Sequence, residues 1–252
     1  MRLFFPQNIF SQLIIDNLPE HLRQAVVKSP SSLISTEINK DESVIGLLPT
    51  MDLIKHKDLY VSQSFGISFE GSLCNSYLYY ESAKKDFSEA YLMGDVSSVE
   101  VLLCKILFSE MYDKSVEIKI AADEKSAAGK NYLLTGDGNF AGDRYVNGIS
   151  FAEEMIDALS LPFVNYVFAS KDRQLMENLN DQLYGIANSV YDQAEELNFH
   201  SAVSENAKTY IKDNISSFII EFNDQDIEGI NQMIRLPYYH GIINDIVELK
   251  FV

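Results

Sequence analysis

Apolar residues along this chain fall into short continuous runs and longer stretches at helical spacing. Residues 3–5 form an apolar run typical of a buried strand, and Pro6 interrupts it. Apolar side chains then recur every three or four residues up to Leu18, which predicts a helix ending before Pro19. A strand at residues 25–27, a helix opening at residues 29–32 and a buried strand at residues 44–48 follow. This order predicts a parallel sheet flanked by helices.

The alternation starts again near Tyr91, after a strand-rich region at residues 66–80. It predicts helices at residues 98–112 and 151–159, and strands at residues 116–120, 132–135 and 163–169. A long helix then follows, with one apolar face made of Leu175, Leu179, Leu183, Ile186, Val190, Ala194 and Leu197.

These patterns predict an α/β protein with two lobes, each a mostly parallel sheet flanked by helices, joined by two crossing strands. A chain of 252 residues is long enough for two modest lobes. The first lobe is expected to contain residues 1–74 and 168–252, and the second residues 75–167. Because open α/β sheets bind ligands at the carboxyl ends of their strands, we expect function in a cleft between the lobes.

Charge limits the partners that this surface can attract. The chain has 37 acidic and 20 basic residues, a net charge of -17, which repels nucleic acid and anionic membranes. An anionic ligand would therefore need local attraction from helix N-termini or backbone N–H groups. The sequence has no run long enough for a membrane span and no secretory signal, so we expect a cytoplasmic protein. No pattern selects an oligomeric state.

Cysteine and histidine give no sign of metal or nucleophilic chemistry. Cys74 and Cys104 are isolated on apolar segments, which favours core roles. The histidines have no neighbouring partners in a recognisable triad, and surface or core roles are expected for His21, His56, His200 and His240. The glycines near Gly136 match neither a phosphate loop nor a dinucleotide fingerprint. We expect no metal and no cofactor.

Ser97 and Glu100 have the spacing of a capping box at the start of the helix predicted at residues 98–112. One interpretation is a helix start only. The other is that this N-terminus faces the cleft and gives its N–H groups and the Ser98 hydroxyl to a carboxylate. Glu100 opposes the second interpretation, since its own charge occupies the first turn. Ser150 and Glu153 repeat the spacing, where a cap alone is expected.

Polar residues follow three other predicted strands. The turn at residues 136–139 presents Asp137 and Asn139 at the end of a strand. One interpretation is that both side chains accept hydrogen bonds from the backbone of their own turn. The other is that they contact a ligand hydroxyl, and that Asp137 accepts a proton. Asn8 and Thr50 follow strands of the first lobe, where they suit helix caps or the cleft.

Six short segments, in this order, resemble the chorismate dehydratase family of the futalosine route to menaquinone. Residues 44–50 resemble its V-G-L-V-P-S strand end, and residues 66–73 its I-A-x-x-G-x-V segment. Residues 97–99 resemble T-S-V, residues 136–137 its G-D turn, residues 161–164 L-P-F-V, and residues 227–230 its C-terminal E-G-L helix. This resemblance covers most of the chain and implies the fold of type II periplasmic binding proteins.

The resemblance implies loss of water from chorismate without metal or cofactor, with a small carboxylate as the partner. It makes Asn8, Asn75, Ser76 and Asp137 candidate catalytic residues, and Thr50, Ser72, Ser97, Ser98 and Asn139 candidate ligand-binding residues. Only one of Asn75 and Ser76 is expected to face the ligand, because side chains alternate along a strand.

Two departures affect the pocket itself. The family's S-Y-L-N-T signature is replaced by residues 5–9, which leaves only Asn8, and the arginine expected before T-S-V is absent. An alternative hypothesis is therefore a non-catalytic binder of small anions with the same fold.

Overall fold

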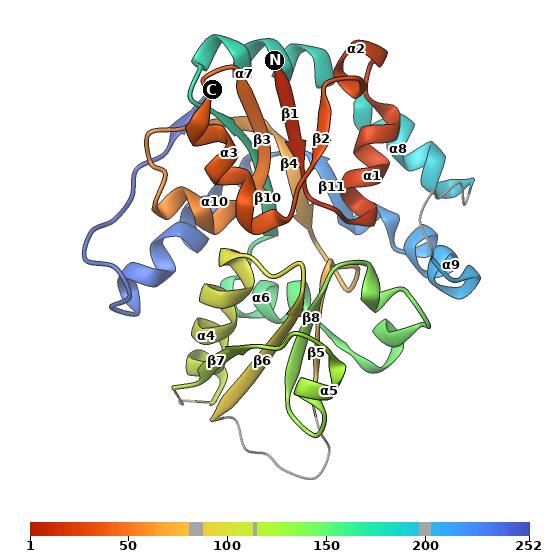
Figure 1. The fold of residues 1–252 in the computed structure, drawn as a ribbon, viewed down its shortest axis with the longest axis vertical. Coiled ribbons are helices and arrows are strands. Elements are labelled where there is room, and N and C mark those ends of the chain that lie inside the picture. The colour runs from red at the N-terminus through yellow and green to blue at the C-terminus, as the bar shows by residue number, and fades with distance from the viewer. Residues whose placement is uncertain (81–87, 113–114, 197–202) are drawn as a thin grey trace.

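The computed structural model describes residues 1–80, 88–112, 115–196 and 203–252, which form two lobes stacked along the long axis of the molecule (Figure 1). Each lobe is built on one β-sheet with helices beside it. Both termini lie at the outer end of the larger lobe, away from the smaller one (Figure 1). The prediction of a two-lobed α/β protein is confirmed.

The sheet of the larger lobe is mixed, not mostly parallel. Its order is β11-β4-β10-β3-β1-β2, with β12 paired to β4. β1, β2 and β3 run parallel, whereas β10 is antiparallel to both of its neighbours, because it returns from the smaller lobe and enters between β3 and β4. The strands are β1 (Arg2–Phe5), β2 (Val26–Lys28), β3 (Val44–Pro49), β4 (Tyr60–Phe69), β10 (Phe163–Ser170), β11 (Phe218–Glu221) and β12 (Lys250–Phe251).

The sheet of the smaller lobe is mixed as well, in the order β7-β6-β8-β5-β9. β6 is parallel to β7 and β8, while β5 is antiparallel to β8 and β9. The strands are β5 (Ser76–Tyr79), β6 (Glu89–Gly94), β7 (Glu117–Ile120), β8 (Tyr132–Thr135) and β9 (Ile149–Ser150).

Several helices begin at side chains that cap their first turns. Asn8, Ser150, Asp172, Ser204 and Asn223 each accept a backbone N–H near the start of a helix. The helices are α1 (Ile9–Asn17), α2 (Glu20–Arg23), α3 (Ile34–Lys40), α4 (Ser98–Tyr112), α5 (Glu124–Ala127), α6 (Phe151–Leu159), α7 (Arg173–Leu183), α8 (Ile186–Glu195), α9 (Glu205–Asp213) and α10 (Asp224–Tyr239). Short 3-10 helices are η1 (Ser31–Leu33), η2 (Thr50–Ile54), η3 (Asp137–Asn139), η4 (Arg144–Asn147) and η5 (Ile215–Ser217).

The chain passes between the sheets twice. Residues 70–75 connect β4 to β5, and residues 160–162 connect α6 to β10. β10 pairs along its length with β3 and β4 of the larger sheet, although residues 163–167 were expected in the second lobe. The predicted limit at residue 167 was therefore too late, because the run beginning at Phe163 is the return strand itself.

The long helix predicted beyond Leu175 is two helices. α7 ends at Leu183 and α8 begins at Ile186, with Gly185 between them at a φ of 80°. The apolar face continues across the break, with Leu179, Leu183 and Val190 all buried, so the pattern of side chains did not reveal it. Leu197, expected on the same face, and His200 lie outside the described residues.

Replacing Gly185 with alanine should lower the free energy of unfolding by about 1 kcal/mol, because a left-handed backbone is unfavourable for a residue with a Cβ atom. Nothing lies within 4 Å of the position that this Cβ would take, so no steric clash adds to the loss of stability. Urea denaturation would measure the loss. Gly185→Asn should lose less, since asparagine tolerates this conformation.

Aromatic side chains fill the core where the lobes meet. Phe10 of α1 packs against Phe69 and Phe218 of the larger lobe, with ring centroids 5.0 Å away in each case. It also meets Phe140 of the smaller lobe at 5.9 Å. Cys74 and Cys104 are free and fully buried, as expected of core residues. Burial raises the pKa of each thiol to about 12.

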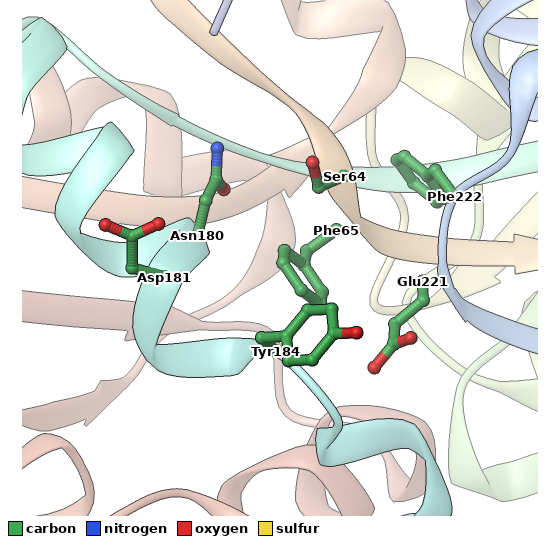
Figure 2. A pocket seen from close by; sticks show the side chains of 7 residues that line it. All are labelled: Ser64, Phe65, Asn180, Asp181, Tyr184, Glu221 and Phe222. Atoms are coloured by element: carbon green, nitrogen blue, oxygen red, sulfur yellow. The ribbon is translucent and has the colours of Figure 1, made fainter.

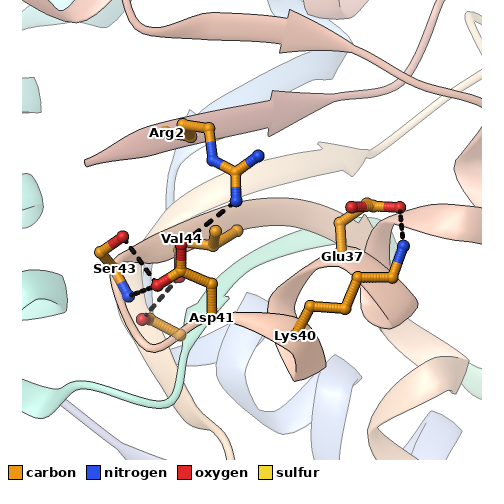
Figure 3. Close-up of polar contacts among 7 residues, drawn as sticks. Arg2, Glu37, Lys40, Asp41, Ser43 and Val44 are labelled. Atoms are coloured by element: carbon orange, nitrogen blue, oxygen red, sulfur yellow. Dashed lines mark hydrogen bonds and ion pairs between the residues drawn. The ribbon is translucent and has the colours of Figure 1, made fainter.

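The turn between α3 and β3 ties the N-terminus to the outer end of the larger sheet (Figure 3). Asp41 accepts hydrogen bonds from the Ser43 backbone N–H at 2.9 Å and from the Ser43 hydroxyl at 2.8 Å. Arg2 of β1 donates to the same carboxylate at 3.2 Å. The hydrogen bonds from Ser43, with Arg2 nearby, lower the pKa of Asp41. This cluster holds the outer ends of the strands and leaves their carboxyl ends to the smaller lobe.

Candidate functional site

The carboxyl ends of strands from both sheets face one another where the lobes meet. We call this region the interlobe junction and define it by Asn8, Ile9, Ser31, Asn75, Asp95, Asp137 and Tyr166. Hydrogen bonds join its two sides directly.

The start of α1 holds the first bond between the lobes. β1 ends at Phe5 and Pro6 cannot continue the sheet ladder, so the chain turns into α1. Asn8 caps the helix by accepting the Ser11 N–H at 2.8 Å. The free N–H of Ile9 donates to Asp137 Oδ1 of the smaller lobe at 2.7 Å. A carboxylate thus occupies the positive end of the helix.

The start of η1 holds a second carboxylate in the same way. Asp95 follows β6 and accepts the Ser31 N–H at 2.9 Å through Oδ1. Its Oδ2 accepts the Ser31 hydroxyl at 2.5 Å. Pro30, directly before Ser31, has no N–H and fixes the approach of the chain. The helical starts that follow β1 and β2 therefore each bind a carboxylate of the smaller lobe.

The carboxyl groups of Asp95 and Asp137 are partly buried. Burial raises the pKa of Asp95, and the hydrogen bonds from Ser31 oppose that rise. Burial also raises the pKa of Asp137, against the Ile9 N–H and the charge of Lys28, while the charge of Asp95 adds to the rise. Water would solvate both groups better, so the helix starts are what keep them here.

Tyr166 and Asn75 complete the junction. The buried Tyr166 hydroxyl lies 3.0 Å from Ser31 Oγ and accepts from Asn75 Nδ2 at 3.4 Å. Burial raises the pKa of Tyr166 well above its ordinary range, so the hydroxyl keeps its proton. Within the described part of the chain, Asn75 Oδ1 and Asn8 Nδ2 are buried and have no hydrogen-bond partner. One free acceptor and one free donor therefore remain beside the bound carboxylates.

Ser76 points away from the larger lobe. Its hydroxyl donates to Glu100 Oε1 at 3.2 Å and lies 3.0 Å from Thr135 Oγ1. Of the two neighbours left open by the sequence, Asn75 is the one that reaches the larger lobe, in accordance with the alternation of side chains along a strand.

The start of α4 is closed by its own residues. Glu100 is fully buried and accepts the Ser97 N–H at 2.9 Å and the Ser97 hydroxyl at 2.6 Å. Ser97 Oγ in turn accepts the Val99 N–H at 3.2 Å. This supports the helix-start interpretation for Ser97. Ser98 Oγ is buried without a hydrogen-bond partner among the described residues.

Three other predicted ligand-binding side chains, those of Asn139, Thr50 and Ser72, make hydrogen bonds within the protein. The Asn139 amide donates to the carbonyls of Leu134 and Gly136, at 2.8 and 3.0 Å, and its oxygen accepts from Tyr79 at 2.8 Å. The Thr50 hydroxyl donates to the Val164 carbonyl at 2.7 Å. Ser72 donates to Asn214 at 3.4 Å. Ser150 caps α6, as expected.

The sequence interpretation did not single out Ser31, Asp95 or Tyr166 as site residues. Ser31 and Asp95 did mark a helix start and a strand end in the pattern. Their partnership joins residues 64 positions apart, and nothing local indicates it. Tyr166 was missed because, in the sequence, it is one of several aromatic residues in a strand expected to be buried.

A separate hollow of about 530 Å³ lies on the larger lobe (Figure 2). Its lining comes from β4, α7, β11 and neighbouring residues: Ser64, Phe65, Asn180, Asp181, Tyr184, Glu221 and Phe222. Figure 2 shows the Tyr184 ring beside the Phe65 ring, with the Glu221 carboxylate near them. It contains none of the residues of the interlobe junction.

Two further properties concern the described residues as a whole. No group of three or more His, Cys, Asp or Glu side chains among them is placed to hold a metal ion. None of their helices has both the length and the apolar composition needed to cross a bilayer.

No protein-family model matches the sequence, and a search of curated proteins gave no match. Solved structures do match the fold. Protein AF1704 from Archaeoglobus fulgidus aligns with a TM-score of 0.64 at 10% identity, over 96% of this chain and 98% of its own. The alkanesulfonate-binding protein SsuA from Xanthomonas axonopodis pv. citri, bound to MOPS, aligns with a TM-score of 0.66 at 9% identity, over 100% and 97%.

The periplasmic aliphatic sulphonate binding protein SsuA from Escherichia coli aligns with a TM-score of 0.62 at 10% identity, over 99% of this chain and 95% of its own. These similarities extend over both lobes. The chain therefore has the two-lobed fold of periplasmic binding proteins, with mixed sheets and flanking helices.

Proposed function

We propose that the protein binds a small carboxylic acid between its lobes, and that this acid is chorismate or a close relative from which the protein eliminates water. The observation that carries the proposal is the pair of helix starts, at Ile9 and Ser31, that each bind a carboxylate. Chorismate has two carboxylates. A ligand placed between the lobes would take over these two positions from Asp137 and Asp95.

The residues around the helix starts suit the rest of such a ligand. Asn8 Nδ2 is a free buried donor for a carboxylate oxygen, and Asn75 Oδ1 is a free buried acceptor for a hydroxyl. Elimination removes a ring proton and a hydroxide, which leave as water while the ring becomes aromatic. Asp137, with its raised pKa, is suited to accept that proton. Donors fixed in a closed site would stabilise the developing charge.

A second candidate is a binder of small anions without catalysis. It is favoured by the carboxylates of the chain itself, which already fill the helix starts, and by the absence from the sequence of the arginine expected before Ser97. The SsuA neighbours are named for binding sulfonates, which are also small anions.

One pair of measurements separates the candidates. Purified protein is mixed with chorismate, and the loss of substrate and the formation of an aromatic product are followed by chromatography. A ligand at a hundred times its Kd should also stabilise the protein by about 2.7 kcal/mol in thermal unfolding. Turnover supports the dehydratase, and stabilisation without turnover supports the binder. If chorismate produces neither turnover nor stabilisation, both candidates are rejected for this ligand.

Replacing Asn8 with serine should weaken chorismate binding about tenfold, since a hydrogen bond to a charged group contributes about 1.5–3 kcal/mol. Serine can still cap α1, so the helix should remain. The matched control is Asn223→Ser, which alters the cap of α10 away from the junction. Calorimetric titration of both variants checks this. Equal affinities would remove Asn8 from the site.

A further inference from the structure

Asp95 and Asp137 connect parts of the chain that are far apart in sequence. The Asp137 bond to Ile9 spans 128 residues, and the Asp95 bonds to Ser31 span 64. Both carboxylates belong to turns of the smaller lobe that follow neighbouring strands, β6 and β8. Both backbone N–H donors, of Ile9 and Ser31, are at helix starts of the larger lobe. The two bonds therefore close the same face of the junction.

The charges around these groups do not favour closure by themselves. Asp95 and Asp137 repel each other, and Glu100 adds a third acidic group near Tyr166. Lys28 is the basic side chain that acts on Asp137. Two like charges in one partly buried region are unfavourable, so the backbone N–H groups of Ile9 and Ser31 must supply the attraction.

Other contacts also join the lobes, but they leave the helix starts alone. Asp143 binds Ser204 and Asn206 before and within α9, and the Tyr145 and Tyr210 rings stack at 4.3 Å. Glu110 of α4 pairs with His240 at 3.0 Å. These contacts lie at the sides of the junction. None of them occupies a position that an acidic ligand would need.

We propose that Asp95 and Asp137 form an interlobe latch, which holds the lobes closed in the absence of ligand and competes with an acidic ligand for the starts of α1 and η1. The closing role stands on the hydrogen bonds alone. The competing role rests on the proposed binding of a small acid. A ligand carboxylate would have to displace the latch, so the affinity measured for it is reduced by the fraction of protein held closed.

Pulsed electron resonance between one spin label in each lobe tests the closing role without any ligand. Glu42→Cys and Ala128→Cys provide exposed label sites in the larger and smaller lobes, while the buried Cys74 and Cys104 should not react. Adding Asp95→Ala and Asp137→Ala should shift the distance distribution to longer distances. Adding Asp157→Ala, an exposed carboxylate on α6, should leave it unchanged.

An unchanged distribution in the double variant would overturn the latch. Should the alanine pair impair folding, judged by circular dichroism, Asp95→Asn with Asp137→Asn removes the charges and keeps the side-chain shape. The same shift, smaller in size, is then expected. No shift in a folded asparagine pair would equally overturn the proposal.

Titration with chorismate tests the competing role. Asp95→Ala should raise the affinity about tenfold over the parent protein, because it frees the Ser31 N–H. Lower or equal affinity would reject the competition. If the distances shift but chorismate binds to no variant, the latch stands and the proposed ligand fails. If chorismate binds and the distances do not shift, the proposed ligand stands and the latch fails.

Discussion

Gly94→Ala should lower the free energy of unfolding by about 4 kcal/mol, a loss expected when a left-handed backbone conformation is combined with a steric clash. Gly94 ends β6 with a φ of 87°. A Cβ atom there would lie 2.0 Å from the Thr135 carbonyl oxygen, which belongs to the backbone of β8 and cannot rotate away. The ends of β6 and β8 would have to separate.

The clash would also disturb the junction. Asp95 follows Gly94 directly, and its N–H donates to the same Thr135 oxygen at 3.2 Å. Separation of the strands would move Asp95 away from Ser31, so closure should weaken together with stability. Chemical denaturation measures the first effect. The same spin labels, in protein that is still folded, measure the second.

Gly129→Ala is the matched control. Its φ of 70° is also left-handed, but nothing lies within 4 Å of the added Cβ. A loss of about 1 kcal/mol is expected from the backbone conformation alone. Similar losses for the two variants would show that the strand ends have room for a side chain and that the close approach at Gly94 is not a requirement of the fold.

Glu100→Ala should lower the free energy of unfolding by about 3 kcal/mol at pH 4.5, because buried donors lose their acceptor. The Ser97 N–H and hydroxyl and the Ser76 hydroxyl all donate to this carboxyl group. Thermal unfolding over a series of pH values measures the loss. The size of the loss should depend on pH, since burial raises the pKa of Glu100 above its ordinary value of 4.5.

The direction of this dependence follows from proton binding. The folded protein holds the Glu100 proton more tightly than the unfolded chain does. The contribution of Glu100 to stability is therefore complete below pH 4.5 and falls as the pH rises toward the higher value of the folded state. The difference between the parent protein and Glu100→Ala should shrink over this range.

Glu100→Gln is the matched control, since its amide oxygen can still accept from Ser97 and it does not titrate. Its stability relative to the parent should improve as the pH rises, by the amount that the parent loses through Glu100. A constant difference across the series would mean that Glu100 keeps its proton, or loses it, equally in both states.

Much of the fold could be predicted because local signals agree with the final packing. α4, α6 and β8 have the predicted limits, since a Ser or Gly lies at or directly next to an end of each, beside a strongly apolar run. The break between α7 and α8 at Gly185 was missed because the apolar face of α7 continues into α8. The spacing of apolar residues therefore gives no sign of the change in backbone conformation. The antiparallel pairing of β10 with β3 and β4 was also missed, because a short apolar run does not indicate which strands it will pair with.

The site was less predictable than the fold. Asn8 and Asp137, predicted from strand ends, and Asn75, implied by the family resemblance, do lie at the interlobe junction. Ser76, Thr50 and Asn139 make internal hydrogen bonds instead. Whether a polar side chain at a strand end faces a ligand or its own backbone depends on partners that lie far away in sequence. The hydrogen bond between Asp95 and Ser31 forms only when the two lobes meet, so no local pattern in the sequence predicts it.

The position of β10 between β3 and β4 also has a consequence for synthesis of the chain. When a ribosome has made the first 160 residues, the smaller sheet has its strands, but β3 and β4 still lack the partner that separates them. The edges of β3 and β4 that face β10 therefore remain unpaired until β10 has been synthesised. The smaller lobe can form early, whereas the larger one depends on pairings between distant residues, the kind that fold slowly and are exposed to aggregation.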